Sequence, residues 1–232
     1  RVGDRQGSAE TLNSMGGVHA VLGRSDEAAE AFEKSLRIYQ ELGSRQRAGF
    51  VLTNLGVLHR AMGMYAKSLD YYAKSLRLAL DIGNPINLAG VYHNMAGVYK
   101  ELGQYEKALE YDGKSLRIKQ DIGDRGGLVT TYMGIGVTMA SMRRFDEALE
   151  QTRRSLSLAE EIGDKLFIQR AVGNLAWIYM LTGRYDAALE MSEKSRALAA
   201  EMGDVASEAV ALNNICDALA HSGKPLEAVV YG

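Results

Sequence analysis

Apolar residues recur along most of the chain with the spacing of amphipathic helices. One run places them at Leu52, Leu55 and Leu58, and the next run places them at Tyr65 and Leu69 and continues in the same way. Residues three or four apart share one face of an α-helix, so each run predicts a helix with one apolar stripe. No convincing run alternates with period two. The pattern therefore predicts an all-α protein without strands.

Glycines divide the sequence into repeats of 40 residues. Each of these glycines can end a helix, because glycine adopts the left-handed conformation without strain. The next residue has a short polar side chain, whose oxygen can accept from the free N–H groups of a new helix. The glycines are Gly3, Gly43, Gly83, Gly123, Gly163 and Gly203, and the predicted caps are Asp4, Ser44, Asn84, Asp124, Asp164 and Asp204.

A second set of glycines follows 20 residues later, so each repeat holds two helices of about 17 residues, or roughly 25 Å. Arg143 takes the place of this glycine in the fourth repeat. Two such helices cannot bury their apolar faces alone, so neighbouring pairs must stack. We expect a single array over residues 1–232, with repeats at about 4–43, 44–83, 84–123, 124–163, 164–203 and a truncated 204–232.

The two ends of the sequence indicate a fragment. The chain begins at Arg1 rather than Met, stops at Gly232 partway along a predicted helix, and lacks the polar terminal helix that caps most solenoids. We expect a longer protein, and any catalytic or DNA-binding domain fused to the array would lie outside this segment.

Charge and composition exclude several classes of function. The 27 Lys and Arg oppose 29 Asp and Glu, which gives a net charge of −2 and a pI near 6.1, so no global basic field attracts nucleic acid or an anionic membrane. No stretch is apolar for long enough to span a bilayer. The single cysteine excludes an internal disulfide, and the four histidines lack metal-ligand spacing. We expect a cytoplasmic protein without cofactor, metal, nucleic-acid or membrane partner.

Small and aromatic residues recur at fixed positions within the repeats. The second repeat has Leu55 and Gly56, then His59, then Ser68 twelve residues after the glycine and Tyr72 four residues further on. This order resembles the tetratricopeptide repeat, and the resemblance covers the whole chain. The usual repeat has 34 residues. The 40-residue form is similar to that of kinesin light chains, Leu-Gly-Asn-repeat regulators of G-protein signalling and many bacterial signalling proteins.

The resemblance implies a right-handed α-solenoid of antiparallel helix pairs that serves as a binding scaffold, with the first helix of each pair lining a concave groove. One position in that helix holds Asn54, Asn94, Asn174 and Asn214. Asparagine is a poor mid-helix residue, but its carboxamide both donates and accepts, as a peptide main chain requires. Related long-repeat arrays use asparagine here to hold peptide main chain, so we expect an asparagine ladder. The alternative is that these amides join neighbouring helices or face water.

Other side chains fall on the same face by register. Arg60, Lys100 and Arg170 would favour an acidic segment, although the chain lacks the dicarboxylate clamp of chaperone-tail receptors. Trp177 is either an exposed contact for a partner or a core residue. The predicted groove residues beside the ladder are Phe50, Thr53, Val57, Arg60, His93, Lys100, Met133, Arg170, Trp177 and Asn213.

No motif indicates an enzyme. The sequence has no phosphate-binding loop, zinc-protease motif, nucleophile elbow or Cys-x-x-Cys pair. His19 and His59 occupy a position that holds tyrosine in other repeats, which favours packing over catalysis. Cys216 falls at a small packing position.

The fourth repeat departs from the pattern, with Gly126, Gly127, Gly134, Gly136 and Arg143. A glycine inside a helix costs up to about 1 kcal/mol relative to alanine. Either this repeat is softer and lets the superhelix open or close, or the glycines admit close helix packing.

We therefore expect a protein-interaction scaffold that binds an extended or helical segment of a partner. Two alternatives remain. In one, the array is a spacer that associates end to end or packs against a flanking domain of its own chain. In the other, it is a receptor for a signalling peptide that regulates a domain outside this segment.

Overall fold

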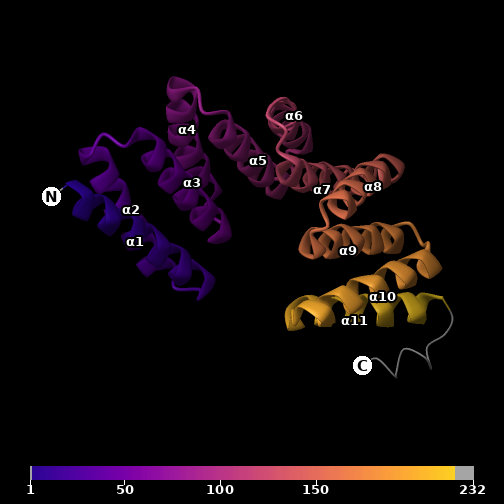
Figure 1. Ribbon diagram of the computed structural model, residues 1–232. Coiled ribbons are helices and arrows are strands. Elements are labelled where there is room, and N and C mark those ends of the chain that lie inside the picture. Colours follow the sequence, from indigo (N-terminus) through magenta and orange to yellow (C-terminus); the bar gives the residue numbers. More distant parts are fainter. Residues whose placement is uncertain (1, 223–232) are drawn as a thin grey trace. The chain divides into compact units, whose positions relative to one another are not determined.

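A computed structural model describes residues 2–222 and shows eleven α-helices and no strand over that range (Figure 1). The prediction of an all-α protein is confirmed, and the helices are 17 to 20 residues long. They are α1 (Val2–Val21), α2 (Ser25–Glu41), α3 (Arg45–Ala61), α4 (Tyr65–Ile82), α5 (Pro85–Glu101), α6 (Tyr105–Asp121), α7 (Arg125–Ser141), α8 (Phe145–Ile162), α9 (Lys165–Leu181), α10 (Tyr185–Met202) and α11 (Val205–His221).

Contacts divide the chain into two compact units, Arg1–Ile122 and Gly123–Gly232. The first unit contains α1 to α6, and the second contains α7 to α11. That all six repeats form one continuous array stays a prediction.

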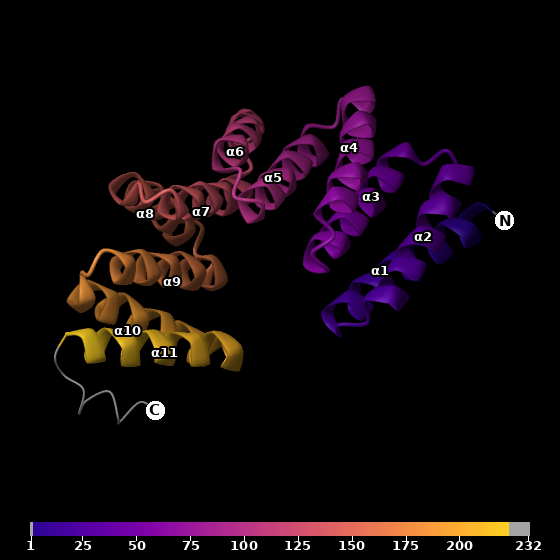
Figure 2. The ribbon, with the colours of Figure 1, turned by 180° about the vertical axis from the view of Figure 1, so that it is seen from behind.

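Within each unit, consecutive helices pack as antiparallel pairs, and the second helix of a pair also packs on the first helix of the next pair (Figure 2). The first helices contact one another, α1 with α3 and α3 with α5 in the first unit, and α7 with α9 and α9 with α11 in the second. In the described residues, the second helices of a unit make no such contacts with one another. The first helices, which we call the inner helices, therefore lie on the inside of each unit's curve, and the second helices are the outer helices.

Glycines and short polar residues end and start the helices. Gly83, Gly163 and Gly203 cap α4, α8 and α10 in the left-handed conformation, with φ of 71°, 75° and 69°. Four of the predicted caps accept a hydrogen bond at their side-chain oxygen from the N–H three residues later. These are Asn84, Asp124, Asp164 and Asp204.

The other two predicted caps differ. The side chain of Ser44 makes no cap hydrogen bond at the start of α3. The prediction for Asp4 is wrong, because α1 already begins at Val2. Asp4 lies instead in the first turn of that helix, where the helix dipole favours a carboxylate.

Close approach of inner and outer helices explains the pairing of small and aromatic residues. A Cβ atom at Gly56 would lie 2.4 Å from the ring of Tyr72, and one at Gly16 would lie 2.7 Å from the ring of Phe32. Tyr72 is fully buried as a result. In the third and fifth repeats the outer residue at this position is not aromatic, and the inner residue is alanine.

A surface ion pair joins the two helices of four repeats in the described part of the chain. A basic residue in the first turn of the inner helix contacts an acidic residue in the last turn of the outer helix, 36 residues later. We call these pairs the clasps. They are Arg5 with Glu41, Arg45 with Asp81, Arg125 with Glu161 and Lys165 with Glu201.

Candidate peptide-binding surface

The asparagine position of the inner helices is half-buried in all four repeats that carry it. Asn54 Nδ2 donates to Asn13 Oδ1 on α1 at 3.0 Å, so this amide joins two inner helices. The partner Asn13 lies 41 positions before Asn54. The residues 41 positions before the other three asparagines are a threonine, a methionine and a glycine, so this amide pair is not repeated there. The side chains of Asn94, Asn174 and Asn214 make no hydrogen bond to another residue of the described structure, so the donors and acceptors of these carboxamides are unused within it.

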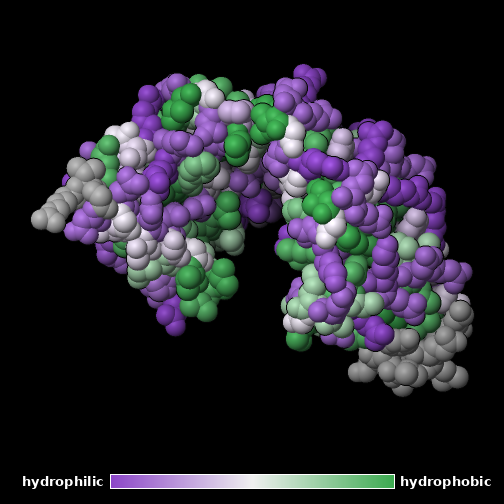
Figure 3. Space-filling model, in the orientation of Figure 1, coloured by the Kyte–Doolittle hydropathy of each residue, from purple (hydrophilic) through white to green (hydrophobic). Residues whose placement is uncertain are grey.

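Two hollows adjoin between α1 and α3 in the first unit, and Asn13 and Ser14 line both. The larger hollow has a volume of about 680 Å³ and lies toward the ends of the two helices. Its walls are mainly apolar, and Figure 3 shows hydrophobic surface at this end of the unit. The main apolar lining residues are Gly17, Val21, Phe32, Val57, Leu58 and Met62.

The smaller hollow lies toward the starts of α1 and α3 and has a volume of about 320 Å³. Glu10 of α1 and Arg47 of α3 form an ion pair there. The guanidinium carbon of Arg47 lies 5.9 Å from the centre of the Tyr39 ring. Phe50 adds an exposed ring to the same hollow.

Three predicted groove residues are large, apolar and exposed. Phe50 and Val57 lie on α3, and Trp177 lies on α9 of the second unit with 36% of its surface exposed. The structure therefore places Trp177 at the surface and not in the core. All three are on inner helices.

Thr53, His93 and Met133, three further residues of the predicted groove, each contact the outer helix of their own repeat. Thr53 Oγ1 is 2.9 Å from Ser75 Oγ, and His93 Nδ1 is 2.8 Å from Asp112 Oδ1. Met133 is only 9% exposed and packs in a core cluster between α7, α8 and α9. This position immediately precedes the asparagine, and one residue rotates a side chain by about 100° around a helix.

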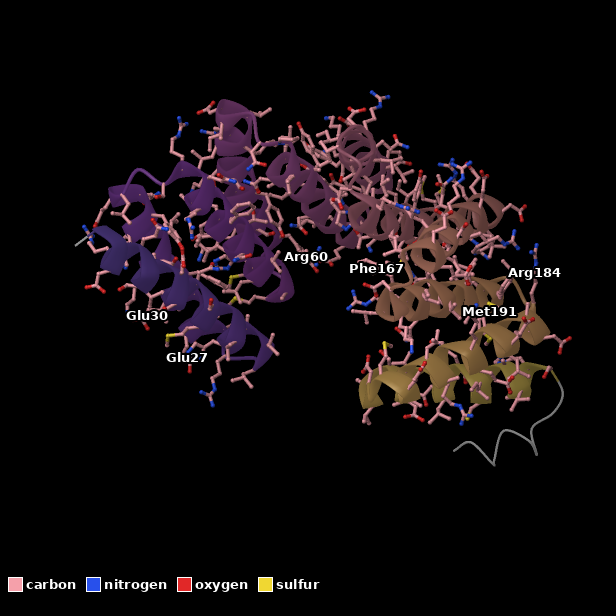
Figure 4. All side chains as sticks on the ribbon, viewed as in Figure 1. Glu27, Glu30, Arg60, Phe167, Arg184 and Met191 are labelled. Atoms are coloured by element: carbon pink, nitrogen blue, oxygen red, sulfur yellow. The ribbon has the colours of Figure 1, made fainter. Side chains whose placement is uncertain are left out.

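The predicted basic residues have different surroundings. Arg60, at the end of α3 (Figure 4), lies over α5, where its Nη1 would be 2.3 Å from a Cβ at Gly97. Its Nε is 3.8 Å from Glu101 Oε1, so its charge is partly compensated. Lys100 is half-buried without an ion pair to a described residue, and Arg170 is exposed on α9.

Asn213, the last of the predicted groove residues, lies in the middle of α11 and is exposed. At the start of α11, a hydrogen bond from Ser207 is the main cause that lowers the pKa of Asp204, and the charge of Arg170 contributes a smaller part. This acidic cap and Arg170 therefore share one region of the second unit.

The histidines and the cysteine contribute to packing. His59 is 4% exposed and stacks on Tyr71, with ring centres 5.2 Å apart and planes 3° from parallel. This confirms the interpretation of His59 as a packing residue. His19 and Cys216 are half-buried. Among the described residues, no group of three or more His, Cys, Asp or Glu side chains is arranged to hold a metal ion, and no helix is long and apolar enough to cross a membrane.

Sequence profiles of the tetratricopeptide repeat match residues 7–81, 87–161 and 170–202. The chain belongs to the tetratricopeptide-repeat family. Repeats of this family form scaffolds for protein interactions. No curated protein matches the sequence of this tetratricopeptide-repeat chain significantly.

Several solved structures share the tetratricopeptide-repeat fold. BtubC (BKLC) from P. vanneervenii has a TM-score of 0.74 at 18% identity, over 90% of this chain and 85% of that one. A Rap protein complexed with competence and sporulation factor has a TM-score of 0.76 at 14% identity, over 97% and 72%. A putative kinesin light chain of Podosopora anserina, with nearly identical TPR-like repeats, has a TM-score of 0.66 at 15% identity, over 84% and 95%. These likenesses confirm the predicted fold, an α-solenoid of tetratricopeptide repeats.

Asn13 and Gly17 lie on this surface, but they are not among the predicted groove residues. Asn13 does not occupy the asparagine position, and only its offset of 41 residues from Asn54 reveals the contact. A Cβ at Gly17 would meet no atom within 4 Å.

Proposed function

We propose that this chain is a protein-interaction scaffold that binds a segment of a partner protein along its inner helices. The observation that carries the proposal is the set of open carboxamides at Asn94, Asn174 and Asn214. Each lies on an inner helix, and exposed apolar side chains such as Val57 and Trp177 lie on the same set of helices. Amides can pair with a peptide main chain while apolar side chains supply contact area. No catalytic step is assigned to this chain.

Selection of peptides from a random display library tests this function. The wild-type chain is compared with a triple variant, Asn94→Ala, Asn174→Ala and Asn214→Ala. The matched control, Gln40→Ala with Gln120→Ala, removes exposed carboxamides from the outer helices α2 and α6. Circular dichroism spectra and melting curves establish that all three proteins are folded.

The wild type and the control should enrich the same peptide motif. Each lost hydrogen bond is worth about 1 kcal/mol, so the triple variant should bind the motif at least about tenfold more weakly. Equal affinity for the triple variant and the wild type would contradict a role for the asparagines.

One observation favours self-association as a second candidate function. Met15 and Val18 of α1 are 46% and 58% exposed, whereas Leu55 and Leu58, at the equivalent positions of α3, are 0% and 4% exposed. A second copy that covers this face of α1 would bury comparable apolar area. Sedimentation equilibrium then shows a mass that grows with concentration, and Val18→Glu abolishes the growth. A mass that stays monomeric at all concentrations excludes this candidate.

A further inference from the structure

We propose that the first unit holds a single tetrahedral oxyanion, such as a phosphate group, at a site between α3 and α5. The guanidinium of Arg60 and the hydroxyl of Tyr72 donate to the anion, and the absence of a side chain at Gly97 provides its space. This inference does not depend on the proposed function, because it concerns a small anion and no partner segment. Its evidence is a pair of donors that the described part of the chain leaves unused.

The hydroxyl of Tyr72 is a buried polar group without a partner. The side chain of Tyr72 is 0% exposed, and its hydroxyl makes no hydrogen bond to any described residue. Ser68 lies one turn earlier on α4, but its hydroxyl donates to the carbonyl oxygen of Gly56 at 2.7 Å. An unpaired buried hydroxyl is unfavourable, so an external group that accepts from Tyr72 stabilises the folded protein.

The guanidinium of Arg60 lies beside this hydroxyl. Arg60 follows Gly56 by one turn on α3, and the Tyr72 ring packs against Gly56, so the arginine and the ring share one face of that helix. Burial is the main cause that raises the pKa of Tyr72, and the charge of Arg60 is the largest influence that lowers it, which agrees with this proximity.

The donors of Arg60 are also unused. Within the described residues the guanidinium makes no hydrogen bond, and its one ion pair is long, at 3.8 Å from Nε to Glu101 Oε1. The two terminal nitrogens of the guanidinium therefore remain as donors. Arginine presents such donors as a planar fork that fits oxyanions.

Gly97 on α5 provides the space for an anion. A Cβ at Gly97 would lie 2.3 Å from Nη1 of Arg60, so the guanidinium rests where any other residue would have its side chain. The side chain of Arg60 is 31% exposed and can turn outward without breaking a hydrogen bond. An anion that takes the vacated space above Gly97 can accept from Arg60 on one side and from Tyr72 on the other.

The directions of the donors favour a tetrahedral anion over a planar carboxylate. The fork of Arg60 engages two oxygens in its own plane. The hydroxyl of Tyr72 comes from a different helix, α4, and needs a third acceptor oxygen, which a phosphate has and a carboxylate lacks. Lys100 occupies on α5 the position of Arg60 on α3, so the charged side chains here have a net charge of +1 even when Glu101 is counted. This balance favours an anion.

Thermal unfolding in inorganic phosphate tests this site with conservative variants. Tyr72→Phe removes only the hydroxyl, and it should fold because the first repeat has Phe32, 3% exposed, at the equivalent position. Gly97→Ala fills the space of the anion. Gly90→Ala is its matched control on the same helix, because a Cβ at Gly90 meets no atom within 4 Å. Sodium chloride at equal ionic strength controls for screening, and sodium acetate offers a planar carboxylate.

Phosphate well above its dissociation constant should raise the melting temperature of the wild type and of Gly90→Ala by about 2 to 4 °C relative to chloride. Gly97→Ala should lose this response. Calorimetric titration should show that Tyr72→Phe binds phosphate at least about tenfold more weakly, because the variant lacks one hydrogen bond to a charged group. In chloride, Tyr72→Phe should be at least as stable as the wild type, since it removes an unpaired hydroxyl.

The same titration with a short phosphoserine peptide distinguishes two sources of the phosphate. Tighter binding of inorganic phosphate identifies a free ion, and tighter binding of the peptide identifies a phosphate group on a larger molecule. Both results support the site, provided that Tyr72→Phe weakens them.

Four outcomes would overturn the inference, and none of them bears on the proposed function. Phosphate that leaves the wild type unaffected excludes the site. An equal response of Tyr72→Phe and the wild type excludes a role for the hydroxyl. An effect of acetate as large as that of phosphate excludes the preference for a tetrahedral anion. A lower stability of Tyr72→Phe in chloride would show that the hydroxyl already has a partner.

Discussion

Gly56 sets the distance between α3 and α4 through the absence of a single atom. A Cβ at this position would lie 2.4 Å from the Tyr72 ring, which is fully buried and has no room to move away. Gly17 lies on an inner helix too, but it faces open space. The two glycines occupy adjacent positions of the repeat. Substitution of each by alanine should therefore change the stability of the protein in opposite directions.

Gly56→Ala should lower the free energy of unfolding by about 2 kcal/mol, because overpacking outweighs the gain in helix propensity. Gly17→Ala should raise it by up to about 1 kcal/mol, since only the propensity changes. Urea denaturation of both variants measures the difference. Equal stability of the two variants would contradict the packing argument.

His59 should make stability depend on pH. Burial is the main cause that lowers its pKa, and the charge of Lys67 lowers it further. The folded pKa is then below the unfolded value of about 6.5, so the unfolded state binds the proton first and stability falls as pH drops below about 6.5. His59→Tyr introduces the residue that the third and fifth repeats have at this position, and it should reduce the loss.

Urea midpoints of the wild type and His59→Tyr, measured at about pH 7.5 and about pH 5.5, test this difference. Other titrating groups are common to both proteins, so they cancel in the comparison. An equal loss of stability in the two proteins would show that His59 is not responsible.

At the scale of the helix, the turns between inner and outer helices share one backbone conformation. Glycine supplies it in most repeats, for example Gly63 with φ of 71°, but Arg143 adopts φ of 60° between α7 and α8. A side chain in the left-handed region costs about 1 to 2 kcal/mol. The fourth repeat therefore contains local strain that the other described repeats avoid.

Arg143→Gly should raise the free energy of unfolding by up to about 1 kcal/mol, because the relief of strain exceeds the added flexibility of the unfolded chain. Gly63→Ala, the reverse change in the second repeat, should lower it by about 1 kcal/mol. Thermal unfolding of both variants provides the comparison. A decrease in both would mean that the turn of the fourth repeat is not strained.

The glycines of the fourth repeat have more than one role. A Cβ at Gly136 would lie 2.5 Å from Thr152 Oγ1, so this glycine admits close packing of α7 on α8. The N–H of Gly127 donates to the cap residue Asp124. The close approach at Gly136 supports the packing explanation over the soft-repeat explanation at that position. Amide exchange that is faster in α7 than in α3, α5 and α9 would favour softness instead.

For the whole molecule, the inner helices offer different side chains at equivalent positions, so the two units have different surfaces. Trp177, the only tryptophan of the sequence, is exposed on α9 in the second unit. Its fluorescence should therefore be quenched efficiently by acrylamide in the folded protein, and a ligand on the inner face of α9 should protect it. A blue-shifted emission that resists acrylamide in the free protein would place this side chain in the core.

The sequence predicted the helices well because the signals that end them are local. The glycines and the caps at Asn84, Asp124, Asp164 and Asp204 act within a few residues, and every turn between described helices lies where they indicate. The contacts of individual side chains on the inner helices were harder to predict. Whether His93 faces a groove or Asp112 depends on how the whole helix is rotated, and the bond between Asn54 and Asn13 depends on the register of two helices. Neither quantity follows from spacing along one helix.

The clasps have a consequence for the origin of such a chain. Each ion pair, such as Arg45 with Asp81, closes within a single 40-residue repeat and uses no residue of the next one. A DNA segment that runs from the glycine at the end of one repeat to the glycine at the end of the next would therefore encode a whole repeat together with its own clasp. Tandem duplication of that segment lengthens the protein without leaving an unmatched charge at the junction. The third repeat, where Pro85 replaces the basic residue, shows that a copy can later lose the pair and keep the fold, as expected of an exposed ion pair that contributes little stability.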